Sequence, residues 1–309
     1  MTEWNLQSVD LKHYRHFDPV LSAEAANSLV RDPAKVARHT FYPFIRYVDR
    51  WNRFAKKGET GPEKKRPIRY AARADAYIFS YYRHLLSIEY ERELSRLELA
   101  ENILAYRRIP LAEGLGGKCN IHYAHEAFDA IKSLGSCYVI ALDIKSYFDR
   151  IDHSRLKMLW CRLLNVPKLP SDHYAVFKAI TAYSYVDKED AYQRLGHFGQ
   201  KRTDSFGRPV LGYITKYKDV PKQICCGKDF RYKIAGGDGN KSIIKKNHKP
   251  YGIPQGAPIS DLLANLYLLD FDNTLNQRIQ TQGGIYLRYS DDILVVVPGS
   301  ESSAKDLMK

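Results

Sequence analysis

The sequence predicts an α+β fold in which helices pack on antiparallel strands, and three observations support this class. Residues 136–143 form a nearly unbroken apolar run, which is typical of a buried strand. Residues 283–299 hold two segments rich in β-branched and aromatic side chains, joined by Tyr-Ser-Asp-Asp at 289–292, which indicates a hairpin. Residues 72–107 carry leucines at helical spacing opposite charged side chains.

Composition places the chain among water-soluble globular proteins. With 309 residues, 44% hydrophobic and 27% charged, it is long enough for about two domains. The N-terminus has no secretory pattern, and no apolar stretch approaches the roughly 20 residues that span a bilayer. Five cysteines without a CxxC pair argue against a disulfide or zinc framework. We therefore expect a cytoplasmic protein without a membrane partner.

The net charge of +13 is concentrated in two segments. Residues 50–70 hold eight Lys/Arg against two Glu, and residues 187–250 hold fifteen Lys/Arg against seven Asp/Glu. Basic segments on a nearly neutral body are typical of proteins that bind a polyanion. Solvated basic loops are the alternative interpretation.

The N-terminal part is predicted to be helical up to a hairpin. Residues 18–51 have a helical pattern interrupted by prolines, with Asp32-Pro33 opening a helix, and a group of aromatic residues that we interpret as packing. Residues 51–70 indicate a hairpin whose tip is Gly-Glu-Thr-Gly-Pro at 58–62 and whose arms are basic. The helices of 72–107 are interpreted as scaffold.

The central part is predicted to present Asp143 at the end of a strand buried on both faces. Asn120 is expected to cap a helix over 122–132, and Asp152 or Ser154 a helix that ends at Leu164. Residues 183–250 lack clear periodicity, and we interpret them as a basic insertion with a few short strands.

The C-terminal part begins with a Gly/Pro turn at 251–258, and Ser260 or Asp261 is expected to cap the helix that follows. A strand-end Asp143, this loop and helix, and an Asp-Asp turn at 291–292 then occur in order. Carboxylates suit Mg²⁺, and two such ions stabilise the attacking and leaving oxygens in phosphoryl transfer. A solvated hairpin turn is the alternative interpretation of the Asp-Asp pair.

Three motifs resemble the palm of bacterial reverse transcriptases of the retron and group II intron type. The first is Ala-Leu-Asp-Ile-Lys-Ser-Tyr-Phe-Asp-Arg-Ile-Asp at 141–152, and the second is Gly-Ile-Pro-Gln-Gly-Ala-Pro-Ile-Ser at 252–260. The third is Arg-Tyr-Ser-Asp-Asp at 288–292, with Ser where many members have Ala or Met. Segments at 39–45, 105–109 and 117–120 resemble the abortive-infection and anti-phage defence group more closely than the retron or intron enzymes.

The resemblance implies a right-hand polymerase fold of fingers and palm that uses two Mg²⁺ ions, with Mn²⁺ as an alternative. It assigns catalysis and metal binding to Asp143, Asp291 and Asp292, with the backbone of Ile144 as a further metal ligand. Phe148 matches the aromatic gate that excludes a 2′-hydroxyl. The residues that match nucleotide-binding positions are Phe148, Gln255, Gly256, Lys65, Arg66, Arg69 and Arg73, and the resemblance does not decide which of the basic residues holds the triphosphate.

The resemblance also implies an organisation and a set of partners. Residues 1–110 would form the N-terminal helical region and fingers, with the basic hairpin at about 50–70. Residues 111–309 would form the palm and remaining fingers with the insertion at about 183–250, and a thumb is expected outside this chain. The implied partners are an RNA template, dNTPs and the DNA product, with a dedicated non-coding RNA, a second copy or a companion protein left open.

The implied function is RNA-directed DNA polymerase in defence against phage. Two alternatives remain open at this point. An RNA-dependent RNA polymerase shares the palm chemistry, although Phe148 argues against it. A maturase-like RNA-binding scaffold with a reverse-transcriptase fold would need none of the three aspartates, and their presence argues against it.

Overall fold

The structure is a computed structural model that describes residues 4–52, 56, 59, 61–111, 116–237 and 239–299. The chain divides into two compact units, each built from two stretches of sequence. The first unit comprises Met1–His84 and Lys168–Ser260, and the second comprises Leu85–Pro167 and Asp261–Lys309. The predicted division near residue 110 lies inside the second unit, and the predicted insertion lies inside the first.

The N-terminal helices begin at capped positions. Helix α1 (Ala23–Val30) starts after Ser22, whose side chain accepts a hydrogen bond from a backbone N–H of the first turn. Helix α2 (Pro33–Ala37) is capped by Asp32 and has Pro33 at its first position, as the sequence predicted. Among the aromatic residues, Phe41 and Phe44 both stack on Phe79, which confirms a packing role.

A basic hairpin is confirmed and is part of a larger sheet, but its first strand begins at Phe44, within the segment 18–51 that was predicted to be helical. Strands β1 (Phe44–Asn52) and β2 (Glu63–Tyr70) pair antiparallel, with Arg46 opposite Arg69. Strand β4 (Ser184–Asp187) adds to β1 in parallel, and the short β7 (Lys245–Lys246) adds to β4. Of the predicted tip at 58–62, Gly58 and Thr60 lie outside the described residues.

The basic insertion is more ordered than the sequence pattern predicted. It contains α7 (Lys188–Arg194), the antiparallel hairpin of β5 (Phe198–Thr203) and β6 (Pro209–Tyr213), and the single-turn α8 (Gly227–Asp229). Its apolar side chains share a core with two distant parts of the first unit, the N-terminal segment and β1. The buried members of this core are Phe17, Ile45, Val186, Ala191, Tyr192, Val220, Ile224, Cys225 and Ile234. The insertion therefore helps to form the core of the first unit.

Two further helices belong wholly or partly to the first unit. Helix α3 (Arg73–Arg96) contains the boundary between the units, and α6 (Ser171–Thr181) belongs to the first unit. Tyr82 of α3 donates a 2.6 Å hydrogen bond to the buried Asp172 carboxylate of α6. In the described part of the chain, no helix is long and apolar enough to traverse a lipid bilayer.

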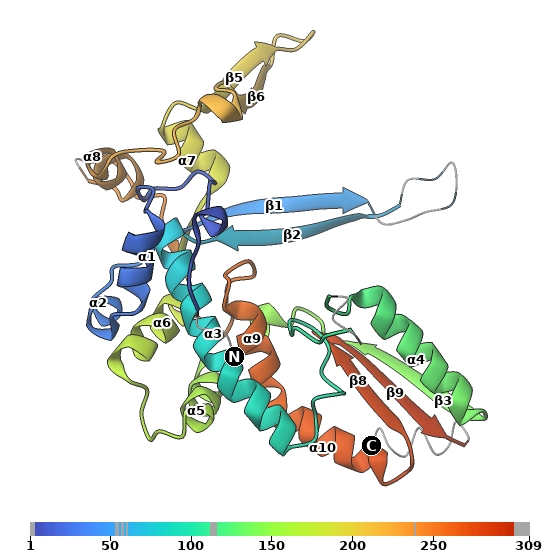
Figure 1. Cartoon of the computed structure of the whole chain (residues 1–309). Coiled ribbons are helices and arrows are strands. Elements are labelled where there is room, and N and C mark those ends of the chain that lie inside the picture. The colour runs from blue at the N-terminus through green and yellow to red at the C-terminus, as the bar shows by residue number, and fades with distance from the viewer. Residues whose placement is uncertain are drawn as a thin grey trace. The chain divides into compact units, whose positions relative to one another are not determined.

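The second unit is built on a three-stranded antiparallel sheet. Its order is β3 (Cys137–Asp143), β9 (Asp292–Pro298) and β8 (Ile285–Tyr289). Helix α4 (Asn120–Leu134) lies beside β3, and α10 (Leu269–Gln280) leads into β8 (Figure 1). Helices α5 (His153–Leu163) and α9 (Ser260–Tyr267) precede α10 along the chain. The prediction of an α+β class with helices packed on an antiparallel sheet is confirmed.

Two local predictions were wrong, and one was confirmed. Strand β3 is at the edge of its sheet, so Tyr138, Val139 and Leu142 are 37–41% exposed rather than buried on both faces. Asn120 lies within the first turn of α4 rather than at its cap, which is Cys119. Asp152 does cap α5, accepting a 2.7 Å hydrogen bond from the Arg155 amide.

Candidate active site

The antiparallel pairing of β3 with β9 brings the predicted acidic residues together in the second unit. Asp143 is the direct cross-strand partner of Asp292, although 148 positions separate them in the sequence. Such partners have Cα atoms roughly 4.5–5.5 Å apart and side chains on the same face of the sheet. The Ile144 amide donates a 3.0 Å hydrogen bond to the Asp291 carbonyl oxygen, which fixes the turn against the end of β3.

The turn between β8 and β9 consists of Ser290 and Asp291, because Tyr289 pairs directly with Asp292. Ser290 has a φ of +61°, and a positive φ at the first turn residue alone is the feature of the type II′ hairpin. Its hydroxyl is 2.9 Å from the Tyr106 hydroxyl. The Tyr289 hydroxyl donates a 2.7 Å hydrogen bond to Asn120 at the start of α4. The backbone at Asp291 is therefore held from two sides.

A fully buried ion pair supports this turn from beneath. The Arg288 guanidinium donates to both carboxylate oxygens of Asp272 at 2.7 and 2.6 Å, and neither side chain is exposed. A third donor, Nη1, reaches the Ser290 carbonyl oxygen at 2.9 Å. Burial opposes the charge on Arg288, but the Asp272 carboxylate outweighs it and raises the pKa of the guanidinium. Arg288 thus connects the Ser290–Asp291 turn to α10.

Arg288 is the first residue of the third motif, but the sequence did not reveal the partners of its side chain. Asp272 also accepts a 2.6 Å hydrogen bond from Tyr286, and Asn265 accepts from Arg288 at 3.0 Å. A signal was present, because Asp272 falls on the buried stripe of α10 with Leu269, Asn276 and Ile279, at spacings of three, four and three. An acidic residue on an apolar helical stripe predicts a buried basic partner.

The carboxylates of Asp143 and Asp292 are suitable ligands for a divalent cation. Among the described residues, no three His, Cys, Asp or Glu side chains converge as a ready metal site. Asp143 and Asp292 nevertheless offer two exposed carboxylates on one face. Mg²⁺ is commonly held by one or two protein carboxylates, with water and substrate phosphates completing its octahedron. The donor set therefore suits Mg²⁺ that binds together with a phosphate ligand.

Phe148 lies in a short 3₁₀ turn, Phe148–Arg150, five residues after Asp143. The preceding backbone turns away from β3 through Ser146, whose φ is +57°. Tyr147 is buried, its ring is 5.8 Å from that of Phe148, and its hydroxyl donates to the Ala264 carbonyl of α9. Tyr147 thus fixes the loop, and Phe148 is partly exposed at its surface.

Three of the predicted nucleotide-binding residues come together in the first unit. The Arg69 amide donates a 2.9 Å hydrogen bond to the Gln255 carbonyl oxygen, so the Gly/Pro loop is bound to strand β2. The guanidinium of Arg69 lies 5.4 and 5.3 Å from the ring centroids of Tyr183 and Tyr185. Arg69 is 8% exposed, and its Nε has no hydrogen-bond partner among the described residues. A buried, unpaired guanidinium N–H is available to an anion.

Gly256 permits the close contact between this loop and β2. Its φ is +110°, and a Cβ there would lie 2.8 Å from the Arg69 carbonyl oxygen and 2.9 Å from Ile68 Cγ2. Because both the backbone conformation and the space require glycine, the loop can approach Arg69 only with glycine at this position.

We expect Gly256→Ala to destabilise the first unit by about 2–4 kcal/mol, since backbone strain and a clash with main chain add. Urea unfolding followed by circular dichroism measures the loss. Gly207→Ala is the matched control, because φ is +76° but no atom lies within 4 Å of the added Cβ. Equal losses for the two variants would contradict a role for close packing at Gly256.

The other predicted basic residues have different surroundings. Lys65 and Arg66 are exposed on consecutive positions of β2, so their side chains point to opposite faces of the hairpin. Lys65 pairs with Glu63 at 2.9 Å, and Arg66 lies 5.2 Å from the Trp51 ring centroid. Lys65 shares its face with Arg69, and Arg66 does not. The two therefore cannot contact the same anion from one face of β2.

Arg73 is a correction to the predicted set. Its side chain is fully buried, with Nε 3.3 Å from the Asp18 carboxylate. Nη1 donates at 3.2 Å to the Tyr14 carbonyl oxygen, and Nη2 donates to that of Asp18. With protein partners on its guanidinium and no exposed surface, Arg73 serves the core of the first unit rather than a nucleotide.

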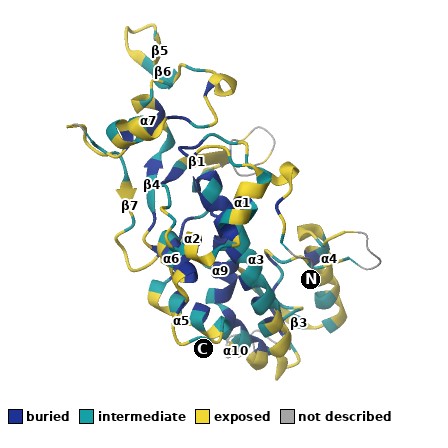
Figure 2. Cartoon of the chain, turned by 60° about the vertical axis from the view of Figure 1, so that its left-hand side comes forward, coloured by how far each residue is buried: buried dark blue, intermediate teal, exposed yellow. Residues whose placement is uncertain are grey.

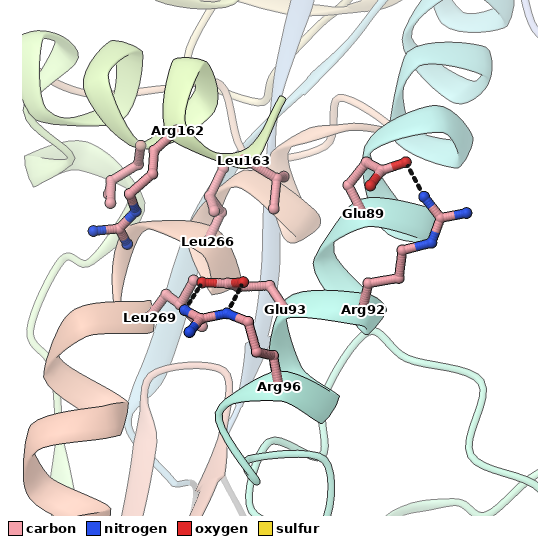
Figure 3. Close-up of a pocket in the computed structure, with 9 residues that line it drawn as sticks. Glu89, Arg92, Glu93, Arg96, Arg162, Leu163, Leu266 and Leu269 are labelled. Carbon is pink, nitrogen blue, oxygen red and sulfur yellow. Dashed lines mark hydrogen bonds and ion pairs between the residues drawn. The ribbon is translucent and has the colours of Figure 1, made fainter. Parts of the chain in front are cut away.

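A pocket elsewhere in the second unit is lined by glutamates that are paired with arginines (Figure 3). It measures about 150 Å³ and is lined by residues of α3, α5, α9 and α10. Glu93 accepts hydrogen bonds of 2.7 and 2.6 Å from Arg96, and Glu89 accepts one of 2.7 Å from Arg92. These pairs satisfy the charged groups within the protein, and the pocket is best explained as part of the helix packing.

Comparisons with known proteins give a structural likeness without a sequence match. No family model and no curated protein sequence matches the chain. Apo telomerase from Candida tropicalis, truncated from its C-terminal domain, aligns with a TM-score of 0.45 and 10% identity. That alignment covers 94% of this chain and 52% of the telomerase chain.

A second likeness is to telomerase from Candida albicans in complex with a fragment of telomeric RNA. The TM-score is 0.44 and the identity 15%, over 91% of this chain and 41% of that one. The chain therefore spans about half or less of the telomerase chains it resembles. At this level of agreement, the likeness assigns the protein to no family.

Proposed function

We propose that the protein is an RNA-directed DNA polymerase that transfers nucleotides from dNTPs with two Mg²⁺ ions. One observation carries the proposal, namely the direct cross-strand pairing of Asp143 with Asp292, with Asp291 in the adjoining turn. Residues from two motifs that are distant in sequence would have no reason to meet at one sheet end if each were a solvated turn. Their meeting supports a shared chemical role.

In this proposal, Asp143, Asp291 and Asp292 hold the metal ions, with the backbone of Ile144 at the same sheet end. The ions would supply the positive charge that stabilises the attacking and leaving oxygens. Arg288 and Asp272 keep the turn in place, so that the carboxylates need no rearrangement when the metal binds. Phe148 would exclude a 2′-hydroxyl, because a packed ring cannot yield to an extra oxygen without loss of contacts.

Within the first unit, the residues that match nucleotide-binding positions gather around Arg69. Arg69 would bind a phosphate through the N–H that has no partner among the described residues, and Lys65 lies on the same face of β2. Gln255 and Gly256 present backbone close to Arg69, where no side chain intervenes. The partners that follow are an RNA template, dNTPs and a DNA product. Defence against phage in a bacterial cytoplasm is the biological setting we propose.

Single-nucleotide addition tests the proposal without requiring processive synthesis. The protein is incubated with an RNA template, a labelled DNA primer, Mg²⁺ and either the next complementary dNTP or the matching NTP. We expect extension by one nucleotide with the dNTP, loss of extension on chelation of Mg²⁺, and much weaker extension with the NTP. Preference for the NTP would indicate an RNA polymerase instead, and no extension with either substrate would favour the RNA-binding scaffold.

A further inference from the structure

A cavity of about 420 Å³ lies within the basic insertion, in a part of the first unit that the proposed chemistry does not use. It is formed by α7, the β5–β6 hairpin and the segment that follows β6. Its size is within the roughly 300–1,000 Å³ range of small-ligand sites. The lining residues are Lys188, Tyr192, Lys201, Tyr213, Ile214, Thr215, Lys216, Tyr217 and Val220.

The cavity combines positive charge with aromatic rings. Its lining includes three lysines and no carboxylate, and none of these lysines forms an ion pair with any described residue. The Lys188 ammonium lies 5.5, 5.4 and 5.8 Å from the ring centroids of Tyr192, Tyr213 and Tyr217. Because three lysines and no carboxylate line the cavity, an anionic ligand is the complementary occupant.

Two of the rings are accessible for stacking. Tyr213 is 41% exposed and Tyr217 is 54% exposed, and much of the β5–β6 hairpin is exposed as well (Figure 2). Tyr217 is supported on one side by Arg15, whose guanidinium lies 4.1 Å from the ring centroid. Arg15 is itself fixed by a 3.1 Å hydrogen bond to the Val220 carbonyl oxygen. A ring held in this way can stack with little loss of conformational entropy.

Two glycines of the hairpin leave space for the side chains of Lys201 and Ile214, which line the cavity. A Cβ at Gly212 would lie 3.2 Å from Lys201 Cδ, and one at Gly199 would lie 3.0 Å from Ile214 Cδ1. Glycine at both positions therefore allows Lys201 and Ile214 to lie against the hairpin backbone at the edge of the cavity.

We propose that this cavity binds single-stranded nucleic acid. The lysines hold the phosphate backbone, and Tyr213 and Tyr217 stack against bases, the combination used by proteins that bind single strands without strong sequence preference. The open, largely exposed hairpin favours a strand that continues beyond the cavity over an enclosed mononucleotide. This binding is separate from the polymerase proposal, and either can fail while the other stands.

The test measures binding of fluorescein-labelled U₁₂ and dT₁₂ to the whole protein by fluorescence anisotropy at several salt concentrations. We expect Tyr217→Ala to weaken binding about 5- to 100-fold, the range for loss of one stacked base. Lys201→Gln should make the slope of log K against log salt concentration less steep by about one, which corresponds to the loss of one phosphate contact. Tyr174→Ala and Lys168→Gln, an exposed tyrosine and lysine elsewhere in the first unit, are the matched controls and should leave affinity unchanged.

Photocrosslinking locates the contact independently of affinity. Oligonucleotides that carry 4-thiouridine or 4-thiothymidine should crosslink to peptides that contain Tyr213 or Tyr217, as read by mass spectrometry. Crosslinks confined to other peptides, together with equal affinities for Tyr217→Ala and Tyr174→Ala, would overturn the proposal. The proposal would also be overturned if UMP bound as tightly as the 12-mers and displaced them completely. That result would indicate a mononucleotide site.

Discussion

Asp143→Asn is expected to reduce single-nucleotide addition by at least about 10³-fold in kcat/KM. The substitution keeps the size of the side chain but removes one of two negative charges that face each other across β3 and β9. Metal ions supply several kcal/mol of charge stabilisation in such reactions, and each 1.4 kcal/mol corresponds to a factor of ten in rate. Single-turnover extension at saturating Mg²⁺ measures the effect. If phage defence depends on synthesis, the same variant should lose protection in a plaque assay.

Asp149→Asn is the matched control, because Asp149 is an exposed carboxylate only six residues further along the same loop. It should retain activity within about a factor of three, since a surface charge of this kind contributes little. Equal losses of activity for the two variants would mean that activity depends on the total charge of the loop and not on the pairing of Asp143 with Asp292. Full activity of Asp143→Asn would refute the proposed metal role.

Local signals in the sequence were sufficient for the elements that determine their own conformation. The hairpin of 51–70 was predicted because its Gly/Pro tip separates two extended arms, and the observed register pairs Arg50 with Lys65 as a continuous ladder. Asp32 and Asp152 were recognisable as caps, because a short acidic side chain before a helix satisfies free N–H groups. The hairpin that contains Asp291 was also predicted from local sequence, because two segments rich in β-branched and aromatic residues flank Tyr-Ser-Asp-Asp.

Features that depend on distant partners could not be predicted in this way. The apolar run of 136–143 indicated a buried strand, but only the sheet order shows that β3 is an edge strand with one neighbour. The insertion lacked periodicity because its apolar residues pack singly against Phe17 and Ile45 rather than along one regular face. Nothing in the local sequence distinguished Arg73 from the exposed Lys65 and Arg66, because its ion pair with Asp18 depends on the tertiary structure.

In the candidate site, too, some features follow from local sequence and others depend on distant partners. The motifs located Asp143, Asp291 and Asp292, and the pairing of Asp143 with Asp292 follows from the antiparallel register of β3 and β9. The side chains that hold the turn were not evident, since Asp272 and Asn265 reach Arg288 only after α9 and α10 fold against β8. The carboxylates proposed to bind metal were thus easier to predict than the side chains that hold their turn in place.

Asp272→Ala is expected to lower the free energy of unfolding of the second unit by about 3–5 kcal/mol. The substitution leaves the Arg288 guanidinium fully buried without its counter-ion, and an uncompensated buried charge is among the costliest single changes. It also leaves the Tyr286 hydroxyl without its acceptor. Urea unfolding monitored by tyrosine fluorescence and circular dichroism measures the loss.

Asp270→Ala on the same helix provides the comparison, because Asp270 is 41% exposed and pairs at the surface with Arg155 and Arg162. It should cost no more than about 1 kcal/mol. The double variant Asp272→Leu/Arg288→Met should recover part of the loss of Asp272→Leu alone, since it removes the stranded charge together with its partner. If the single and double variants were equally unstable, the buried charge would not be the cause. Arg288 also donates to the Ser290 carbonyl oxygen. The double variant should therefore remain less active than its stability predicts, which would separate the contribution of the ion pair to stability from its effect on the Ser290–Asp291 turn.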